Sequence, residues 1–188
     1  MSFVASSTAN GAVVRALGFS PDGKYVVTSA SYVSGSYHAL SLFSIGSDTL
    51  TYLDGYNSTS TSSTSSVSFH PSGVYFISNG GAARVFKIVD NTLSVVYEAL
   101  DDPGSDFYPT NPTFSPDGRY VATGNWSDTH PYVYLFRFEN GILTLLGHVT
   151  KGNKNICRFS FSPDGRYIAI TNYDTVSIST ALQIFEVA

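Results

Sequence analysis

Four nearly identical heptapeptides constrain this chain of 188 residues more than any other feature of its sequence. They read FSPDGKY, FHPSGVY, FSPDGRY and FSPDGRY, at residues 19–25, 69–75, 114–120 and 161–167. The intervals between their first residues are therefore 50, 45 and 47 positions. Self-similarity at a period of about 40–50 residues indicates that one structural unit is built several times along the chain.

Each heptapeptide has the features of a turn between two strands. A β-rich run ends at the Phe, and the Pro stops the hydrogen-bonded ladder because it has no N–H to donate. The Asp-Gly or Ser-Gly pair is typical of a tight turn, since glycine adopts positive φ without strain. The next strand begins at the Tyr. We therefore predict a hairpin corner, with Phe and Tyr burying aromatic surface on either side of it; a ligand-binding loop used four times is the alternative.

Three further β-rich runs follow each of the first three corners in the same order, separated by turn residues, and two follow the last corner. They are short and rich in β-branched and aromatic residues, and no segment has an apolar period typical of a helix. Four-stranded units at this period predict an all-β fold: a β-propeller of four antiparallel blades, forming one domain over residues 1–188. The second run of each unit places a phenylalanine at an equivalent position: Phe43, Phe86, Phe136 and Phe185.

With these motifs the chain resembles the WD-repeat and lactonase-type β-propellers, in which FSPDG followed by a YxxxxN-like strand is a recurrent blade signature. The resemblance covers nearly the whole chain. The Trp-Asp dipeptide of the WD family is absent, and the four equivalent phenylalanines stand near the place of its Trp. The Gly-His pair occurs once, at Gly147-His148. The resemblance therefore implies a degenerate propeller without the buried hydrogen-bond tetrad of the WD family.

The two ends of the sequence predict how the ring closes. The last repeat stops after its third strand, whereas residues 2–6 provide a spare strand before the first corner. We expect this strand to complete the last blade and to cover an edge that would otherwise invite aggregation. Closure within one chain gives four blades, and closure between two chains gives eight, with identical interfaces at both joints. Because the resembling families generally have six to eight blades, self-association is favoured; a fragment of a longer propeller is the third possibility.

Composition and charge exclude several classes of function. The net charge is −4, and ten Lys and Arg residues are scattered along the chain. Binding of nucleic acid requires clustered cations, so nucleic acid is not an expected partner. No apolar run approaches the ~18 residues of a membrane span, and the N-terminus lacks the basic and apolar regions of a signal peptide. The single cysteine, Cys157, excludes an internal disulfide and is expected to be a small buried residue.

We expect functional residues in the loops that differ between repeats, because loops on a rigid scaffold usually carry function. These loops are predicted to emerge on one face, around the central channel. Aromatic side chains beside amides and carboxylates suit recognition of a protein or a glycan. No metal or cofactor is expected, since no second His lies at ligand spacing and DDPGSD does not match a calcium loop. The candidate contacts are Asp106, Tyr108, Trp126, His130, Tyr132, Tyr173 and Asp174.

Two classes of function are compatible with these loops. The first is a non-catalytic module that binds a protein or a glycan, or assembles into a larger particle. The second is a lactonase-like hydrolase, which needs a general base and a polarising group at the channel. Asp128, His130 and Asp174 offer such groups, but no nucleophile or Ser-His-Asp order accompanies them. The sequence therefore favours the binding module, and no catalytic residue is assigned. Trp126 has an alternative, purely structural role, in which it caps a blade.

Overall fold

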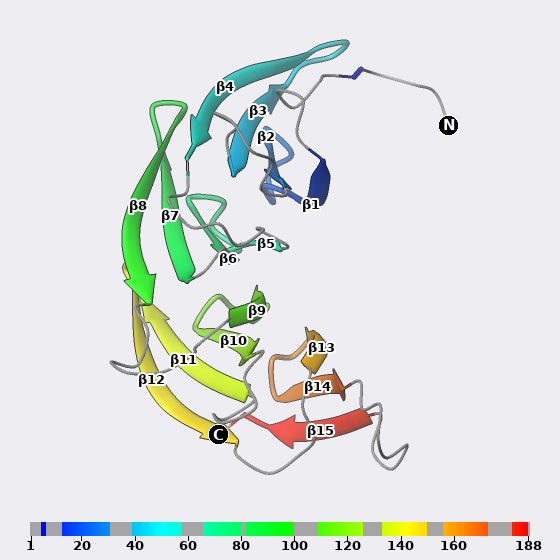
Figure 1. Ribbon diagram of the computed structural model, residues 1–188, viewed down its shortest axis with the longest axis vertical. Helices are drawn as coiled ribbons and strands as arrows, with labels where there is room; N and C mark the ends of the chain where they lie inside the picture. The colour runs from blue at the N-terminus through cyan, green and yellow to red at the C-terminus, as the bar shows by residue number, and fades with distance from the viewer. Residues whose placement is uncertain are drawn as a thin grey trace.

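The computed structural model describes residues 5–6, 13–30, 39–57, 66–79, 82–99, 109–125, 133–149, 156–172 and 182–187. These residues form four antiparallel sheets, numbered here as blades 1 to 4 (Figure 1). Blade 1 contains β1 (Val14–Phe19), β2 (Tyr25–Ala30), β3 (Leu40–Ile45) and β4 (Leu50–Tyr56), and blade 2 contains β5 (Val67–Phe69), β6 (Tyr75–Asn79), β7 (Ala83–Val89) and β8 (Thr92–Ala99). Blade 3 contains β9 (Pro109–Phe114), β10 (Tyr120–Asn125), β11 (Val133–Glu139) and β12 (Ile142–Val149), and blade 4 contains β13 (Ile156–Phe161), β14 (Tyr167–Asn172) and β15 (Leu182–Glu186).

The blades stand side by side along an open arc, as Figure 1 shows. The first strands β1, β5, β9 and β13 line its concave side, and the outer strands β4, β8 and β12 form its convex side. Consecutive first strands are in contact, β1 with β5, β5 with β9 and β9 with β13. The predicted all-β propeller fold is thus confirmed, and the arc leaves blade 1 and blade 4 at its two ends.

Blade 4 has three strands in the described part of the chain, where blades 1 to 3 have four. The predicted closing strand, residues 2–6, lies mostly outside the described residues, and residues 5 and 6 are not part of a strand. Closure of the last blade by the N-terminus therefore stays a prediction.

The heptapeptides form the predicted corners between the first two strands of each blade. The four corner glycines have φ between 72° and 77°, a region that favours glycine. In blade 3, Gly118 N–H donates to Ser115 O and Ser115 N–H to Tyr120 O, both at 2.9 Å. Proline therefore ends one strand and glycine turns the chain into the next.

The second and third strands pair in the same register in every blade. The predicted phenylalanine equivalence is confirmed, because Phe43 faces Val26, Phe86 faces Phe76, Phe136 faces Val121 and Phe185 faces Ile168. A register shift follows at the same place in each outer hairpin, between residues 42 and 43, 85 and 86, and 135 and 136. Such bulges increase the local twist of the outer strands.

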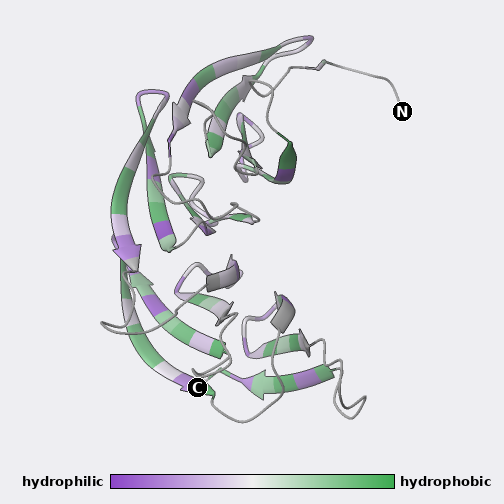
Figure 2. Ribbon diagram, viewed as in Figure 1, coloured by the Kyte–Doolittle hydropathy of each residue, from purple (hydrophilic) through white to green (hydrophobic). Residues whose placement is uncertain are grey.

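The hydrophobic core lies between blades, as three clusters that each span two neighbours. One cluster joins Val27, Leu40 and Leu42 of blade 1 to Phe76 and Phe86 of blade 2. Two similar clusters join blades 2 and 3, and blades 3 and 4. In Figure 2 the hydrophobic stretches also extend to β1 and β15, at the two ends of the arc.

Candidate binding surfaces

The loop residues predicted to bind a partner all lie outside the described residues. The structure therefore neither brings them together nor separates them, and each stays a prediction. The side chain of Cys157 is also outside the described part. The seven loop residues concerned are Asp106, Tyr108, Trp126, His130, Tyr132, Tyr173 and Asp174.

The described residues instead present the two surfaces by which blades pack on one another. We call the surface toward the following blade the trailing face and the surface toward the preceding blade the leading face. In the joint between blades 2 and 3, the trailing face contributes Ile77, Ala83 and Val85. The leading face contributes Phe114, the corner phenylalanine, and Phe136.

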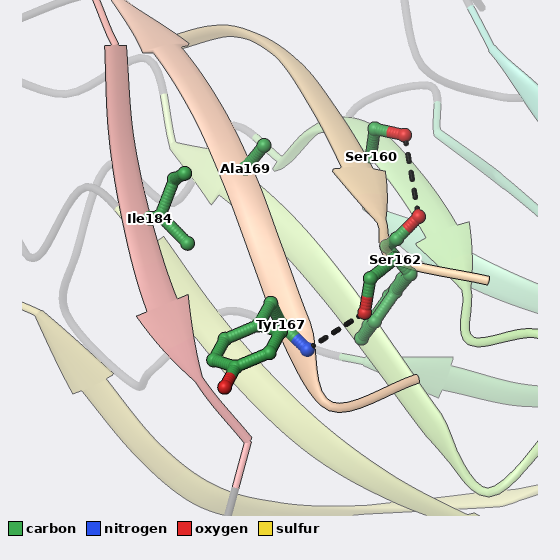
Figure 3. A pocket seen from close by; sticks show the side chains of 6 residues that line it. Ser160, Ser162, Tyr167, Ala169 and Ile184 are labelled. Carbon is green, nitrogen blue, oxygen red and sulfur yellow. Dashed lines mark hydrogen bonds between the residues drawn. The ribbon is translucent and has the colours of Figure 1, made fainter. Parts of the chain in front are cut away.

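The trailing face of blade 4 carries the same kinds of side chain, and no blade lies on top of it in the described part of the chain. Strand register makes Ala169, Leu182 and Ile184 the equivalents of Ile77, Ala83 and Val85. Leu182 is 60% exposed and Ile184 65%, whereas Ala83 and Val85 are 1% and 0% exposed. A hollow of about 530 Å³ lies over this face (Figure 3). Its lining consists of Ser160, Phe161, Ser162, Tyr167, Ala169 and Ile184.

The leading face of blade 1 is partly open as well. Phe19 is 60% exposed, whereas its equivalent in blade 3, Phe114, is 7% exposed. Val26 and Phe43, deeper on the same blade, are buried, and the Phe43 ring packs edge-on against Tyr52 at 5.8 Å. The open part of this face is therefore a rim along β1.

The corners of neighbouring blades are stacked. A Cβ added to Gly73 would lie 3.6 Å from Pro21 Cδ of the preceding corner, and one added to Gly165 would lie 3.9 Å from Pro116 Cδ. Gly118 is closer still to its predecessor, because a Cβ there would overlap the His70 ring. A Cβ on Gly23 meets none of the described residues within 4 Å. Among the described residues, the first corner thus has no neighbouring corner stacked on it, whereas the other three do.

In the first two joints, the outer hairpin of the following blade lies next to the corner tyrosine of the blade before it. Tyr25 Oη–H donates to Asn91 Oδ1 at 2.8 Å, which ties blade 1 to the β7–β8 turn. A Cβ on Gly141, in the β11–β12 turn, would lie 3.5 Å from Tyr75 Cε1. Tyr167 of blade 4 belongs to the open hollow and is 39% exposed.

A second hollow, of about 400 Å³, lies between blades 3 and 4 beside β15. Elsewhere the outer strands of neighbouring blades are in contact, β4 with β8 and β8 with β12. This hollow thus occupies the place of an outer strand of blade 4. It is lined chiefly by apolar residues of β11, β12, β14 and β15, which include Val133, Leu135, Leu146, Ile168, Ile170 and Phe185.

The polar groups of three corners are used within the corners. Ser115 Oγ–H donates to Asp117 Oδ1 at 2.6 Å and accepts the N–H of Tyr120 at 2.9 Å, and blades 1 and 4 repeat this arrangement. Burial raises the pKa of Asp117, but hydrogen bonds from Ser115 and from the backbone and side chain of Arg119 outweigh it and hold the pKa at about 2. The pKa of Asp22 is lowered by hydrogen bonds from Ser20 and from Lys24 N–H. These carboxylates serve the turns and are poorly suited to act as bases at neutral pH.

Blade 2 builds its corner with different chemistry. His70 replaces the serine, and its Nδ1 accepts the N–H of Ser72 at 3.0 Å. The imidazole packs against the rings of Phe114 and Phe138 in blade 3, at 5.2 and 5.0 Å between centroids. Burial lowers the pKa of His70, and the Gly118 backbone and Asp117 carboxylate partly oppose this. His70 is thus a packing residue at a blade joint.

Four antiparallel blades, each with a heptapeptide corner between its first two strands, define the class of the protein as a β-propeller. Within that class, parts of the sequence are similar to WD repeats. The profile of the WD domain, G-beta repeat, matches residues 2–36 and 140–176. No curated protein matches the sequence.

Solved structures with the same fold are distant in sequence. A candidate 6-phosphogluconolactonase from Bacteroides uniformis has 21% identity and a TM-score of 0.74, over 98% of this chain and 55% of that one. Hydrazine synthase from Kuenenia stuttgartiensis has 14% identity and a TM-score of 0.72, over 99% and 49%. The β-propeller domain of Cps50 (Swd1) from Myceliophteria thermophila has 14% identity and a TM-score of 0.71, over 94% and 55%. The chain spans about half the length of each.

The described surfaces suit apolar recognition. Within the described ranges, no three His, Cys, Asp or Glu side chains are grouped to hold a metal ion. The same part of the chain has no helix long and apolar enough to cross a membrane. The sequence interpretation missed the two end faces, although Leu182 and Ile184 repeat the pattern of Ala83 and Val85.

Proposed function

We propose that the chain is a non-catalytic assembly module that binds protein through the open faces of its terminal blades. The observation that carries this is the apolar hollow over Ala169 and Ile184, which repeats surfaces that are buried in the interior joints. Contiguous exposed apolar surface with a polar rim is typical of protein contact sites. A glycan site would need several convergent polar groups, so a protein partner is favoured.

The loops around the channel supply a second place for partner contacts in this proposal. Trp126 and Tyr108 are the aromatic candidates there, and Asp106 is a polar one. The general role of WD-repeat propellers in protein interactions supports this assignment. A Trp126→Ala variant is expected to lose affinity for a loop-face partner and to keep the fold.

A lactonase-like hydrolase is the second candidate, and the description of the Bacteroides uniformis structure is the observation in its favour. At 21% identity that likeness concerns the fold alone, and fold does not determine catalysis. The groups that would act as base or acid on the channel side, His130 and Asp174, belong to the loops outside the described residues.

Mass in solution and hydrolysis together test the proposal. We expect a mass above the 20.2 kDa of one chain by light scattering, increasing between about 1 and 100 μM. We expect 6-phosphogluconolactone to open no faster than in buffer. A constant mass of one chain, together with lactone hydrolysis that Asp174→Asn abolishes, would favour the hydrolase instead.

We further propose that residues 2–6 supply the outer strand of blade 4 and occupy the hollow beside β15. The place of β15 as the last strand of blade 4 in the described part of the chain, and the apolar lining of the hollow, support this. Deleting residues 1–6 should then increase binding of an apolar dye, and adding a peptide of residues 1–8 should reverse it. An unchanged dye signal after the deletion would contradict the assignment.

A further inference from the structure

We propose that the corner of blade 2, residues 69–75, is a proton-operated latch, in which a proton on His70 frees the imidazole from its seat on blade 3 and opens the corner. The seat is formed by the rings of Phe114 and Phe138 and by the backbone at Gly118. The latch belongs to an interior joint, so it goes beyond the proposed function and does not depend on the open faces of blades 1 and 4.

The closed corner uses His70 as a hydrogen-bond acceptor. Its Nδ1 accepts the N–H of Ser72 at 3.0 Å and lies 2.8 Å from Ser72 Oγ, which in turn accepts the N–H of Val74 at 3.3 Å. Because Nδ1 accepts, the neutral ring carries its proton on Nε2. A second proton can be added only at Nδ1, where it would point at the N–H of Ser72. Protonation of the ring therefore conflicts with the hydrogen bonds that close the corner.

The seat on blade 3 is apolar and fits the imidazole closely. Phe114 and Phe138 are buried, and their ring centroids lie 5.2 and 5.0 Å from that of His70. Tyr75 of blade 2 packs against the same ring at 6.2 Å. A Cβ on Gly118 would overlap Nε2 and the two ring carbons beside it, so only a glycine leaves room for the ring. An imidazolium held in this place loses part of its hydration, which disfavours the charged form.

The charged groups around the seat only partly compensate for this loss. Asp117, in the facing corner, favours a proton on His70, but its carboxylate already accepts hydrogen bonds from the backbone and side chain of Arg119. Arg119 also places a positive charge beside that carboxylate. On β7, the Lys87 ammonium lies 5.8 Å from the ring of Tyr75, which packs against the imidazole. Burial is the largest influence and keeps the pKa of His70 below its usual value.

The corners of blades 1, 3 and 4 are built without a group that titrates near neutral pH. They place a serine and an aspartate where blade 2 has His70 and Ser72, and the serine Oγ accepts the N–H of the corner tyrosine at 2.9 Å in each. The pKa of each aspartate is lowered by hydrogen bonds, so these carboxylates stay charged between pH 7.5 and 5.5. The described part of the chain holds one other histidine, His148, which is exposed on β12. A change of pH in this range should therefore act on one corner of the four.

Amide hydrogen exchange of the full chain, resolved by residue, measures the opening of each corner. The N–H groups of His70, Ser72 and Gly73 donate hydrogen bonds inside the closed corner. After correction for the intrinsic effect of pH, their exchange should become faster between pH 7.5 and 5.5, by up to about tenfold, because the open corner binds a proton near pH 6.5. The amides of the corners at 19–25 and 161–167 should keep their protection.

The matched variant combines His70→Ser with Ser72→Asp, which gives blade 2 the FSPDG sequence of the other corners. Loss of the imidazole leaves a gap on blade 3 and lowers the protection of this corner at every pH. The dependence of its exchange on pH should nevertheless disappear, because no titrating group is left in the corner. His148→Gln, which changes the exposed histidine of β12, is the control and should behave as the wild type.

Nitrogen NMR of the imidazoles in the wild-type chain tests the latch without any variant. We expect His70 to carry its proton on Nε2 at pH 7.5 and to titrate below pH 6.5. A proton on Nδ1, or titration at or above pH 6.5, would overturn the latch. Equal acceleration of exchange in all four corners would also overturn it, because the proton would then act on the whole fold. The same holds if exchange at 69–75 still depends on pH in the double variant.

Discussion

The interior joints and the two ends of the arc use the same side chains with opposite results. Val85 and Ile184 occupy the same register position in their blades, yet Val85 is fully buried and Ile184 is 65% exposed. Phe114 and Phe19 differ in the same way at the corner. Burial in this protein is therefore a property of pairs of blades, and a single blade cannot cover its own apolar surface. This dependence on the neighbour is typical of repeat architectures.

The largest expected loss of stability comes from shortening a buried side chain in an interior joint, compared with the equivalent exposed side chain at the end of the arc. Leu42, fully buried in the joint between blades 1 and 2, and Ile184 are equivalent in register. Leu42→Ala should lower the free energy of unfolding by about 2–5 kcal/mol, because it removes buried methyl groups and leaves a cavity. Ile184→Ala should change it by about 0.5 kcal/mol or less in the dilute single chain. Urea unfolding at low concentration measures both, and equal losses would show that the end face is buried in solution.

The next largest expected loss of stability comes from replacing a corner glycine with alanine. Gly118→Ala forces a side chain at φ 77° into the place of the His70 ring and should cost about 2–4 kcal/mol. Gly23→Ala has the same backbone penalty at φ 72° but free space around it, so about 1–2 kcal/mol is expected.

A double variant separates backbone strain from collision. Combining Gly118→Ala with His70→Ala removes the ring that collides with the new methyl group. The combined loss should be smaller than the sum of the two single losses, as expected for residues in contact. Strict additivity would mean that backbone strain alone accounts for the effect at Gly118.

The sequence predicted the parts of the molecule that repeat. Corners, blades and the register of the phenylalanines follow from local chemistry, because Pro, Gly and alternating apolar residues act in the same way in each unit. The exposure of side chains at the ends of the arc does not follow from such a pattern, since Ile184 and Val85 occupy the same position in the sequence repeat. It depends on whether a neighbouring blade is present, which is a property of the assembly.

The structure tests the predicted partner site less than it tests the fold, because the loop residues of that site lie outside the described part of the chain. Its residues, such as Trp126 and Asp174, were chosen because their loops differ between repeats, and a segment without a repeat has no internal register to place it. The corner of blade 2 is an intermediate case. The change from FSPDG to FHPSG is visible in the sequence, but the packing of His70 on Phe114 and Phe138 comes from the next blade.

That histidine predicts a pH dependence confined to one joint. Burial lowers the pKa of His70, so the folded chain resists a proton that the unfolded chain accepts near pH 6.5. The free energy of unfolding should therefore fall as pH drops below about 6.5, by at most about 1.4 kcal/mol per pH unit. Unfolding curves between pH 7.5 and 5 test this, and His70→Asn should flatten the dependence.

Asp117→Asn is the control for that titration. The pKa of Asp117 is held at about 2, so the stabilisation it gives is present above the ordinary pKa of 3.8 and is lost as pH falls from there toward 2. Because the Asp117 carboxylate raises the pKa of His70, the variant should lower that pKa further and leave the slope between pH 7.5 and 5 at least as steep as in the wild type. A flattened slope in that range would assign the dependence to Asp117 or its surroundings and not to His70.

The smallest expected loss of stability comes from removing the hydroxyl group of a corner tyrosine. Tyr25→Phe removes the hydroxyl that donates to Asn91 Oδ1 across the joint of blades 1 and 2, and about 0.5–1.5 kcal/mol of stability should be lost. Tyr167→Phe changes the equivalent residue at the open end, where no hairpin lies over it among the described residues, so unfolding of this variant should match the wild type in dilute solution. At concentrations that favour assembly, a loss at Tyr167 approaching that at Tyr25 would show that the turn of a second copy covers it. A loss that is the same at all concentrations would show that Tyr167 already has its partner within the chain, and the distinction between interior joints and ends would then fail at this position.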